Sequence, residues 1–211
     1  MKSKLALLAL AVPAAFGAVV VFHPGVAFAV TPLAQQAATV LTAGTYTVDP
    51  MHTSVGFEVG HLGLSRIQGR FTDVAGKVVV DPNEVGKSSV TFRIGTKSVD
   101  TAVAARDAHL RTKDFFDVET YPDIVFASTK VAKKGKGYVA TGNLTMHGAT
   151  QEVQIPFEAF GATSDQGTKV GIVASPIKLS RKTFGVGDPK FANSLSDDVT
   201  VRLSFEAAKD K

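Results

Sequence analysis

The chain of 211 residues contains no cysteine. This absence excludes disulfide bonds, thiol chemistry and attachment of a lipid through an N-terminal cysteine. A chain of this length can bury a sizeable core without covalent cross-links. Stability therefore has to come from packing.

A strong excess of either charge is also missing. Lysine and arginine number 23 against 19 acidic residues, which gives a formal net charge of +4. Proteins whose main partner is nucleic acid usually carry a dense basic surface. We therefore expect no nucleic-acid partner.

Familiar catalytic patterns are absent as well. No Gly-x-Ser-x-Gly elbow occurs, and the acids fall mainly in turns or on the polar side of alternating segments. The glycine-rich stretches 60–63 and 185–187 do not lead into helices, so they lack the context of a phosphate-binding loop. We predict that the protein is not an enzyme, has no catalytic residues and needs no cofactor.

The histidines are scattered. After the first thirty residues they are His52, His61, His109 and His147, and no two have the i, i+2 or i, i+4 spacing of metal ligands. Isolated histidines more often serve structure than metal binding. We predict no metal site.

One long hydrophobic run stands at the start of the chain. A short basic segment, the apolar stretch 5–22 and the small residues of Ala27-Phe28-Ala29 together have the pattern of a secretory signal. We expect a signal peptide at 1–29, cleaved after Ala29, and a location in the periplasm or outside the cell. Because the run is long for a signal core, an uncleaved anchor is the alternative. Loss of Lys2 and Lys4 would lower the net charge from +4 to +2.

Residues 30–43 show no clear periodicity, and we interpret them as a flexible linker before a single domain at 44–208. Apolar residues within this domain alternate with polar ones in many short segments, which is typical of strands with one dry face. Turn sequences such as Lys134-Gly135-Lys136-Gly137 separate them. This pattern predicts an all-β fold of about eight antiparallel strands.

The dry faces of these strands need a partner. Since the sequence offers too little helix to cover them, the sheet must close on itself as a barrel. Apolar residues would then fill the interior or line a cavity for one small ligand. We predict that the interior-facing, ligand-binding residues include Phe57, Val59, Phe71, Phe92, Ile94, Leu110, Phe115, Phe116, Phe126, Ile155, Phe157 and Ile172.

The segment Asp100–Arg111 breaks the alternation. We expect a short helix there, capped at its start by Asp100 or Thr101 and carrying a side-chain pair between Asp107 and Arg111. The helix and the loop behind it would close one end of the barrel.

Polar groups at the barrel mouth are the remaining signal. His61 continues the parity of inward positions near a strand end, whereas Arg106 and His109 belong to the predicted helix. These three side chains are our candidates for contacting a ligand head group. The alternative is that they form a solvated face or hold the cap in place.

Several motifs together resemble the YceI-like proteins. They run in the family's order from about Gly44 to Ala207 and comprise Thr45-Tyr46-Thr47-Val48-Asp49-Pro50-Met51-His52, His61-Leu62-Gly63-Leu64-Ser65, Arg106-Asp107-Ala108-His109-Leu110-Arg111, Gly142-Asn143-Leu144-Thr145-Met146-His147-Gly148 and Ser180-Arg181-Lys182-Thr183-Phe184-Gly185. Thr183 departs from the acid that is common in the family at this place.

This resemblance implies a lipocalin-like barrel, export, and binding of a long polyisoprenoid or other apolar lipid. Transport, storage and a role in stress are the functions that such binding would serve. An enzyme acting on a small apolar substrate in the same cavity is the alternative, and a barrel that is only a scaffold is a third hypothesis. Association with a second copy as a homodimer stays open.

Overall fold

The structure is a computed structural model that describes residues 40–164 and 167–211. The predicted signal peptide and its cleavage site lie outside these residues. Of the predicted linker, residues 40–43 are described. Leu41 packs against the core, and the carbonyl of Thr42 accepts a hydrogen bond from the Tyr46 hydroxyl at 2.7 Å.

Strands dominate the domain, as the alternation predicts. They are β1 (Gly44–His61), β2 (Ser65–Phe71), β3 (Val74–Val80), β4 (Ser89–Gly95), β5 (Val99–Asp100), β6 (Asp123–Lys134), β7 (Gly137–Met146), β8 (Ala149–Ser164), β9 (Gly167–Ala174), β10 (Ile177–Ser180) and β11 (Leu195–Lys209). One α-helix, α1 (Ala104–Leu110), and three short 3-10 helices, η1 (Val85–Lys87), η2 (Thr96–Ser98) and η3 (Pro189–Phe191), complete the described residues.

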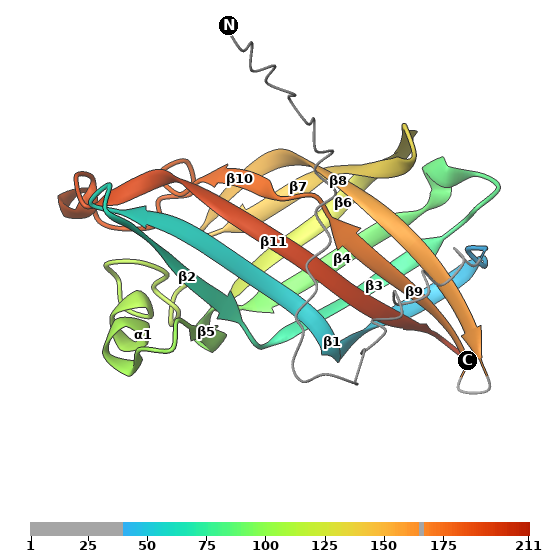
Figure 1. Cartoon of the computed structure of the whole chain (residues 1–211), viewed down its shortest axis with the longest axis horizontal. Helices are drawn as coiled ribbons and strands as arrows, with labels where there is room; N and C mark the ends of the chain where they lie inside the picture. Colours follow the sequence, from blue (N-terminus) through green and yellow to red (C-terminus); the bar gives the residue numbers. More distant parts are fainter. Residues whose placement is uncertain (1–39, 165–166) are drawn as a thin grey trace, which may run out of the picture. The chain divides into compact units, whose positions relative to one another are not determined.

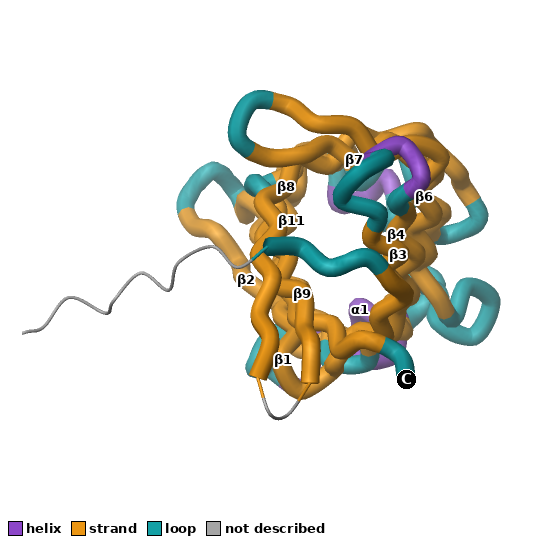
Figure 2. Tube along the Cα trace, turned by 90° about the vertical axis from the view of Figure 1, so that its right-hand side faces the viewer, coloured by secondary structure: helices purple, strands orange, loops and turns teal. Residues whose placement is uncertain are grey.

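The sheet closes into an antiparallel barrel (Figures 1 and 2). Around the ring the order is β1, β3, β4, β6, β7, β8, β9 and β11, and β11 returns to pair with β1. The prediction of a closed all-β barrel of about eight strands is confirmed. Closure leaves the ring strands without a free edge, which satisfies their backbone groups within the sheet.

Three ring strands are interrupted, which explains how eleven strands form an eight-stranded barrel. β2 and β3 both pair with β1, and β9 and β10 both pair with β11. The break between β9 and β10 falls at Ser175-Pro176, where proline has no N–H to donate to the ladder. The third interruption lies between β4 and β5, where the 3-10 helix η2 separates the two strands.

The two halves of the barrel are filled differently. In the half near the β6–β7 turn, buried side chains pack into a core that includes Tyr46, Val48, Val78, Val131 and Val170 and leaves a small hollow of about 40 Å³. The half toward α1 encloses a larger cavity of about 200 Å³. The core thus closes one end of the barrel and leaves the interior of the other end available.

The helix caps the barrel as predicted, but its start is different. α1 begins at Ala104 with Val103 in the N-cap position, and no side chain caps it. The Asp100 carboxylate accepts instead from the amide of Ala102, and Thr101 is bound by Asp107. The prediction of a cap from Asp100 or Thr101 is therefore wrong. The chain turns sharply at Ala102, whose φ is 60°, and this turn separates both residues from the first turn of the helix.

Candidate functional site

An apolar cavity of about 200 Å³ lies inside the barrel. All twelve residues predicted to face inward line it. Eighteen further residues line the cavity and are missing from the prediction. They are Val55, Gly56, Val90, Ile124, Ala140, Leu144, Met146, Val153, Ala174, Ile177, Leu179, Arg181, Val186, Leu195, Val199, Val201, Leu203 and Phe205. Most of the missed residues share the inward parity of the predicted ones, so the same alternation could have found them.

Strand register explains why these side chains gather. Phe92 on β4 lies opposite Phe126 on β6, and Ile94 lies opposite Ile124 two residues further along. Residues at such alternate positions point to the same face of a sheet. The ring of Phe92 also packs across the barrel against Phe205, with centroids 5.3 Å apart. The strands therefore present a continuous apolar surface to the cavity.

One leucine and two phenylalanine side chains close the cavity at the cap end. Leu110, Phe115 and Phe116 all line it, and Phe116 makes an edge contact with Phe71 at 5.5 Å between ring centroids. Phe115 is buried, whereas Phe116 is partly exposed. The loop after α1 thus forms part of the cavity wall.

Arg111 ties this cap to the barrel. Its guanidinium donates from Nε to the carbonyl of Lys97 and from Nη2 to the carbonyl of Val99, both at 2.8 Å. The predicted side-chain pair between Arg111 and Asp107 is therefore wrong, because each side chain has a different partner. Helical spacing alone did not reveal that η2 and β5 offer nearby carbonyls.

Asp107 is instead the buried centre of the turn before the helix. Its carboxylate accepts from both the amide and the hydroxyl of Thr101. Arg106, a predicted mouth residue, donates from Nε to the Thr101 hydroxyl at 2.7 Å and from Nη2 to the Thr101 carbonyl at 2.8 Å. Arg106 therefore holds the turn together and is not among the residues that line the cavity.

His109, the second mouth candidate, lies on the outside of the cap. Its Nε2 is 2.8 Å from a carboxylate oxygen of Asp114, whose other oxygen accepts from Lys190 Nζ at 2.8 Å. The bond with His109, followed by the bond with Lys190, lowers the pKa of Asp114. This network joins the loop after α1 to η3.

His61, the third candidate, is also absent from the cavity wall. The inward parity continues through Val59, but the register with β11 shifts between Val59 and His61. The pairing of β1 with β2 stays in register up to His61 opposite Ser65, so the extra residues lie in β11 and the alternation of β1 itself continues. His61 is the last residue of β1 and lies beyond the side chains that line the cavity.

Arg181 is the polar side chain that sequence reasoning missed. It follows β10, is only 5% exposed, and lines the cavity near Val186 and Leu195. Arg181 belongs to the motif Ser180–Gly185 that resembles the YceI-like proteins. Because it lies in a loop, the alternation of strand residues could not place its side chain inside the barrel. Among the described residues lining the cavity, Arg181 alone carries an ionisable side chain.

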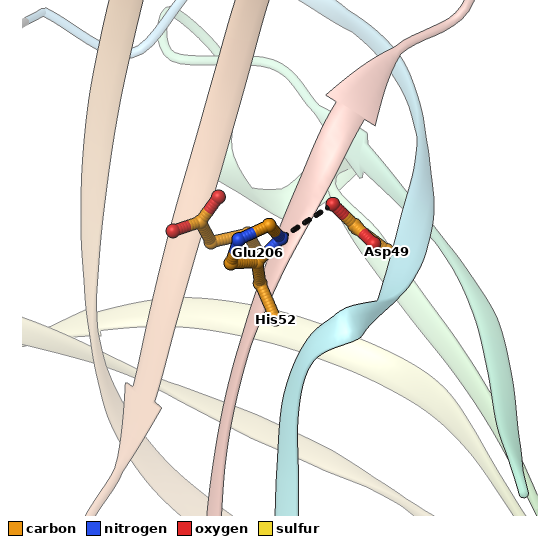
Figure 3. A group of neighbouring side chains, drawn as sticks. All are labelled: Asp49, His52 and Glu206. Atoms are coloured by element: carbon orange, nitrogen blue, oxygen red, sulfur yellow. Dashed lines mark hydrogen bonds and ion pairs between the residues drawn. The ribbon is translucent and has the colours of Figure 1, made fainter.

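A second polar group gathers at a bulge in β1. Asp49, His52 and Glu206 bring potential metal-binding atoms within 4.8 Å of one another, and His52 lies between the two carboxylates (Figure 3). Lys169 Nζ is 3.0 Å from Glu206 and 3.9 Å from Asp49, so an ammonium group already compensates the carboxylates. Asp49 also accepts from the amide of Met51, which stabilises the bulge.

The bond from His52 is the main cause of a lowered pKa at Asp49. We assign this group a structural role.

None of the described helices is long and apolar enough to span a bilayer.

Comparison with known proteins places this cavity in a family context. The model of the YceI-like domain matches residues 46–207. A UPF0312 protein of Photorhabdus laumondii is 37% identical over 175 residues, covering 80% of this chain and 88% of the relative. A UPF0312 protein of Vibrio cholerae is 39% identical over 149 residues, covering 68% of this chain and 78% of the relative.

Solved structures share the fold. BcnA of Burkholderia cenocepacia has a TM-score of 0.69 at 24% identity and covers 76% of this chain and 99% of its own. The YceI protein of Campylobacter jejuni has a TM-score of 0.62 at 27% identity, with 70% and 88% covered. A polyisoprenoid-binding domain from Saccharophagus degradans, implicated in plant cell wall breakdown, has a TM-score of 0.62 at 17% identity, with 78% and 98% covered. The chain belongs to the YceI-like domain family.

Proposed function

We propose that this protein binds a long apolar lipid, of which a polyisoprenoid is the best candidate, inside the α1 half of its barrel. The observation that carries the proposal is the cavity, whose wall is apolar except at Arg181. A polyisoprenoid-binding domain with the same fold supports this choice of ligand.

Hydrophobic burial provides enough free energy for such binding. Each buried methylene-sized group contributes about 0.8 kcal/mol, so about ten groups contribute roughly 8 kcal/mol before the cost of ordering the chain. Because the apolar wall supplies this term without hydrogen bonds, affinity would depend on chain length more than on polar contacts.

The composition of the wall favours binding over catalysis. General acid–base chemistry needs a titratable group within hydrogen-bond reach of the substrate. Among the described residues at the cavity wall there is no histidine and no carboxylate. The alternative of an enzyme acting on a small apolar substrate therefore receives no support from this cavity.

Export and a carrier or storage role complete the proposal. The signal-like start of the sequence supports export. The proposed ligand is poorly soluble in water and needs a protein to carry it across an aqueous compartment, which supports the carrier or storage role. Homodimer formation is a separate proposal, with sedimentation of the purified chain as its test.

A pair of matched substitutions tests the binding site. Val153 on β8 lines the cavity, whereas Val173 on β9 points outward and is 50% exposed. Val153→Phe places a larger side chain in the space for the ligand, so we expect at least tenfold weaker binding of a fluorescent polyprenyl probe. Val173→Phe should leave affinity unchanged. Equal affinity of all three proteins, folded by circular dichroism, would show that the lipid does not occupy the cavity.

A further inference from the structure

The positive charge of Arg181 is the one ionisable group among the described residues that line the cavity. It sits at the cap end of the cavity, where its side chain is 5% exposed. Burial of a guanidinium without an ionic partner is unfavourable unless other groups compensate the charge. The partners of Arg181 therefore determine what this end of the cavity can bind.

The contacts of the guanidinium in the described residues are all to main-chain carbonyls. Nε donates to Ser196 at 3.0 Å and Nη1 to Val186 at 3.0 Å, with a longer contact to Gly187 at 3.5 Å. Nη2 makes only a 3.4 Å contact with the carbonyl of Leu195. The two N–H groups of Nη2 are thus the least well satisfied of the five.

The carboxylate of Asp197 is near Arg181 but is engaged elsewhere. It accepts from the Ser180 hydroxyl and from the amide of Lys182 at 3.0 Å. Among the described residues, the ion pairs within 4.0 Å do not include Arg181. Carbonyl dipoles therefore orient its side chain, while its full positive charge has no directly paired anion.

The surrounding loop is built to keep the guanidinium in this place. The main-chain carbonyl of Arg181 accepts from the amides of Phe184 and Val186, and the main-chain amide of Arg181 donates to the main-chain carbonyl of Asp197. Gly187 has a φ of 89°, and a Cβ there would lie 2.7 Å from Arg181 Nη1 and 3.4 Å from the Phe115 ring. A side chain at Gly187 would therefore collide with the guanidinium and contact the ring of Phe115.

We propose that Arg181 anchors an acidic end group, a carboxylate or a phosphate, of the lipid whose chain fills the cavity. This inference rests on the proposed function and adds to it the class and the orientation of the ligand. An arginine fork matches the paired oxygens of either anion, and an apolar environment strengthens the attraction. The acidic end lies at the cap beside Phe115, and the tail points toward Phe157 and Ile172 in the middle of the barrel.

Three probes that share the same isoprenoid chain and differ only in the end group test the proposal. They are geranylgeraniol, geranylgeranoic acid and geranylgeranyl phosphate, measured at about pH 8, where an ordinary carboxyl group is ionised. We expect the wild-type protein to bind the acid and the phosphate at least tenfold more tightly than the alcohol. A preference for only one anion would identify the end group, and a preference for both would show that charge alone is recognised.

Variants separate anchoring from loop structure. Arg181→Met should bring the two anionic probes to the affinity of the alcohol, while Arg181→Lys should retain part of the preference. Arg202→Met is the matched control, because Arg202 has a 59% exposed side chain outside the cavity. Its selectivity should equal that of the wild type.

A spectroscopic measurement decides the question even if Arg181→Met fails to fold. The Nε–H NMR signal of Arg181 in the wild-type protein should shift on addition of the acid and the phosphate, and should shift much less with the alcohol. Equal affinity for all three probes, or equal shifts, would overturn the anchoring role and leave lipid binding intact. Failure of every probe to bind would instead contradict the proposed function itself.

Discussion

Phe115 and Phe191 stack almost in parallel, with ring centroids 5.0 Å apart and an angle of 20° between their planes. Phe115 belongs to the loop after α1 and lines the cavity, whereas Phe191 belongs to η3. The His109 ring makes T-shaped contacts with both, at centroid distances of 5.1 Å and 5.7 Å. This aromatic contact joins the two segments that close the cap, so the cap and the cavity share a side chain.

Removal of this stack should speed ligand exchange. An aromatic pair contributes about 0.5–1.5 kcal/mol beyond its buried area, so Phe191→Ala should raise the dissociation rate of a bound lipid roughly two- to tenfold. Stopped-flow transfer of a fluorescent lipid to vesicles measures this rate. Phe160→Ala, on the outside of β8 where Phe160 is 42% exposed, serves as the control. An unchanged rate in Phe191→Ala would mean that the cap does not limit exchange.

The Asp114 network should make the cap sensitive to acid. Asp114 faces His109 and Lys190, and Lys190 also lies 3.7 Å from Asp188. The pKa of Asp114 is lowered in the folded protein by these bonds. Its contribution to stability is therefore complete above the ordinary carboxyl pKa of about 4 and is lost as the pH falls below it, through the lowered folded value.

Thermal unfolding of the wild type and Asp114→Asn across this range checks the sign. We expect the wild type to be the more stable protein near neutral pH and the difference to shrink as the solution is acidified. A difference that stays constant with pH would show that the carboxylate charge does not contribute.

Loss of the Asp107 carboxylate should destabilise the turn before α1. Asp107 is 8% exposed and accepts two hydrogen bonds from Thr101. Asp107→Ala leaves these donors without their partner, and we expect a loss of about 1–3 kcal/mol in the free energy of unfolding. Chemical denaturation measures the change. Glu119→Ala, at an exposed position of the same region, should change stability by less than about 0.5 kcal/mol.

Two glycines in strands should differ sharply in their tolerance of alanine. A Cβ at Gly142 on β7 would lie 2.4 Å from the carbonyl oxygen of Ala127, whereas a Cβ at Gly171 on β9 would meet nothing within 4 Å. We expect Gly142→Ala to cost about 1–3 kcal/mol because β6 must shift. Gly171→Ala should be neutral or slightly stabilising. Similar urea midpoints for the two variants would contradict the close approach of β6 and β7.

The alternation in the sequence was sufficient to predict the barrel and the side chains on its inner wall. Phe92, Ile155 and Phe157 lie where period two places them, because strand geometry fixes the direction of each side chain. The same alternation continues to His61 in the register with β2, but this last residue of β1 is not among those that line the cavity. Where the cavity ends depends on the other strands and loops, which the sequence of one strand does not reveal.

Polar contacts in the cap were harder to predict for the same reason. Helical spacing suggested a pair between Asp107 and Arg111, but the preferred partners come from η2, β5 and Thr101. Arg181 was missed because its position inside the barrel results from the path of a loop. Contacts between segments distant in sequence decide these cases.

Mass spectrometry of an organic extract of the protein, purified from the cells that produce it naturally, is the most direct test of the central claim. We predict about one long-chain apolar lipid per protein chain, retained through purification in aqueous buffer and recovered in the organic extract. An empty protein that also takes up no polyisoprenoid in solution would contradict lipid binding and leave the barrel as a scaffold.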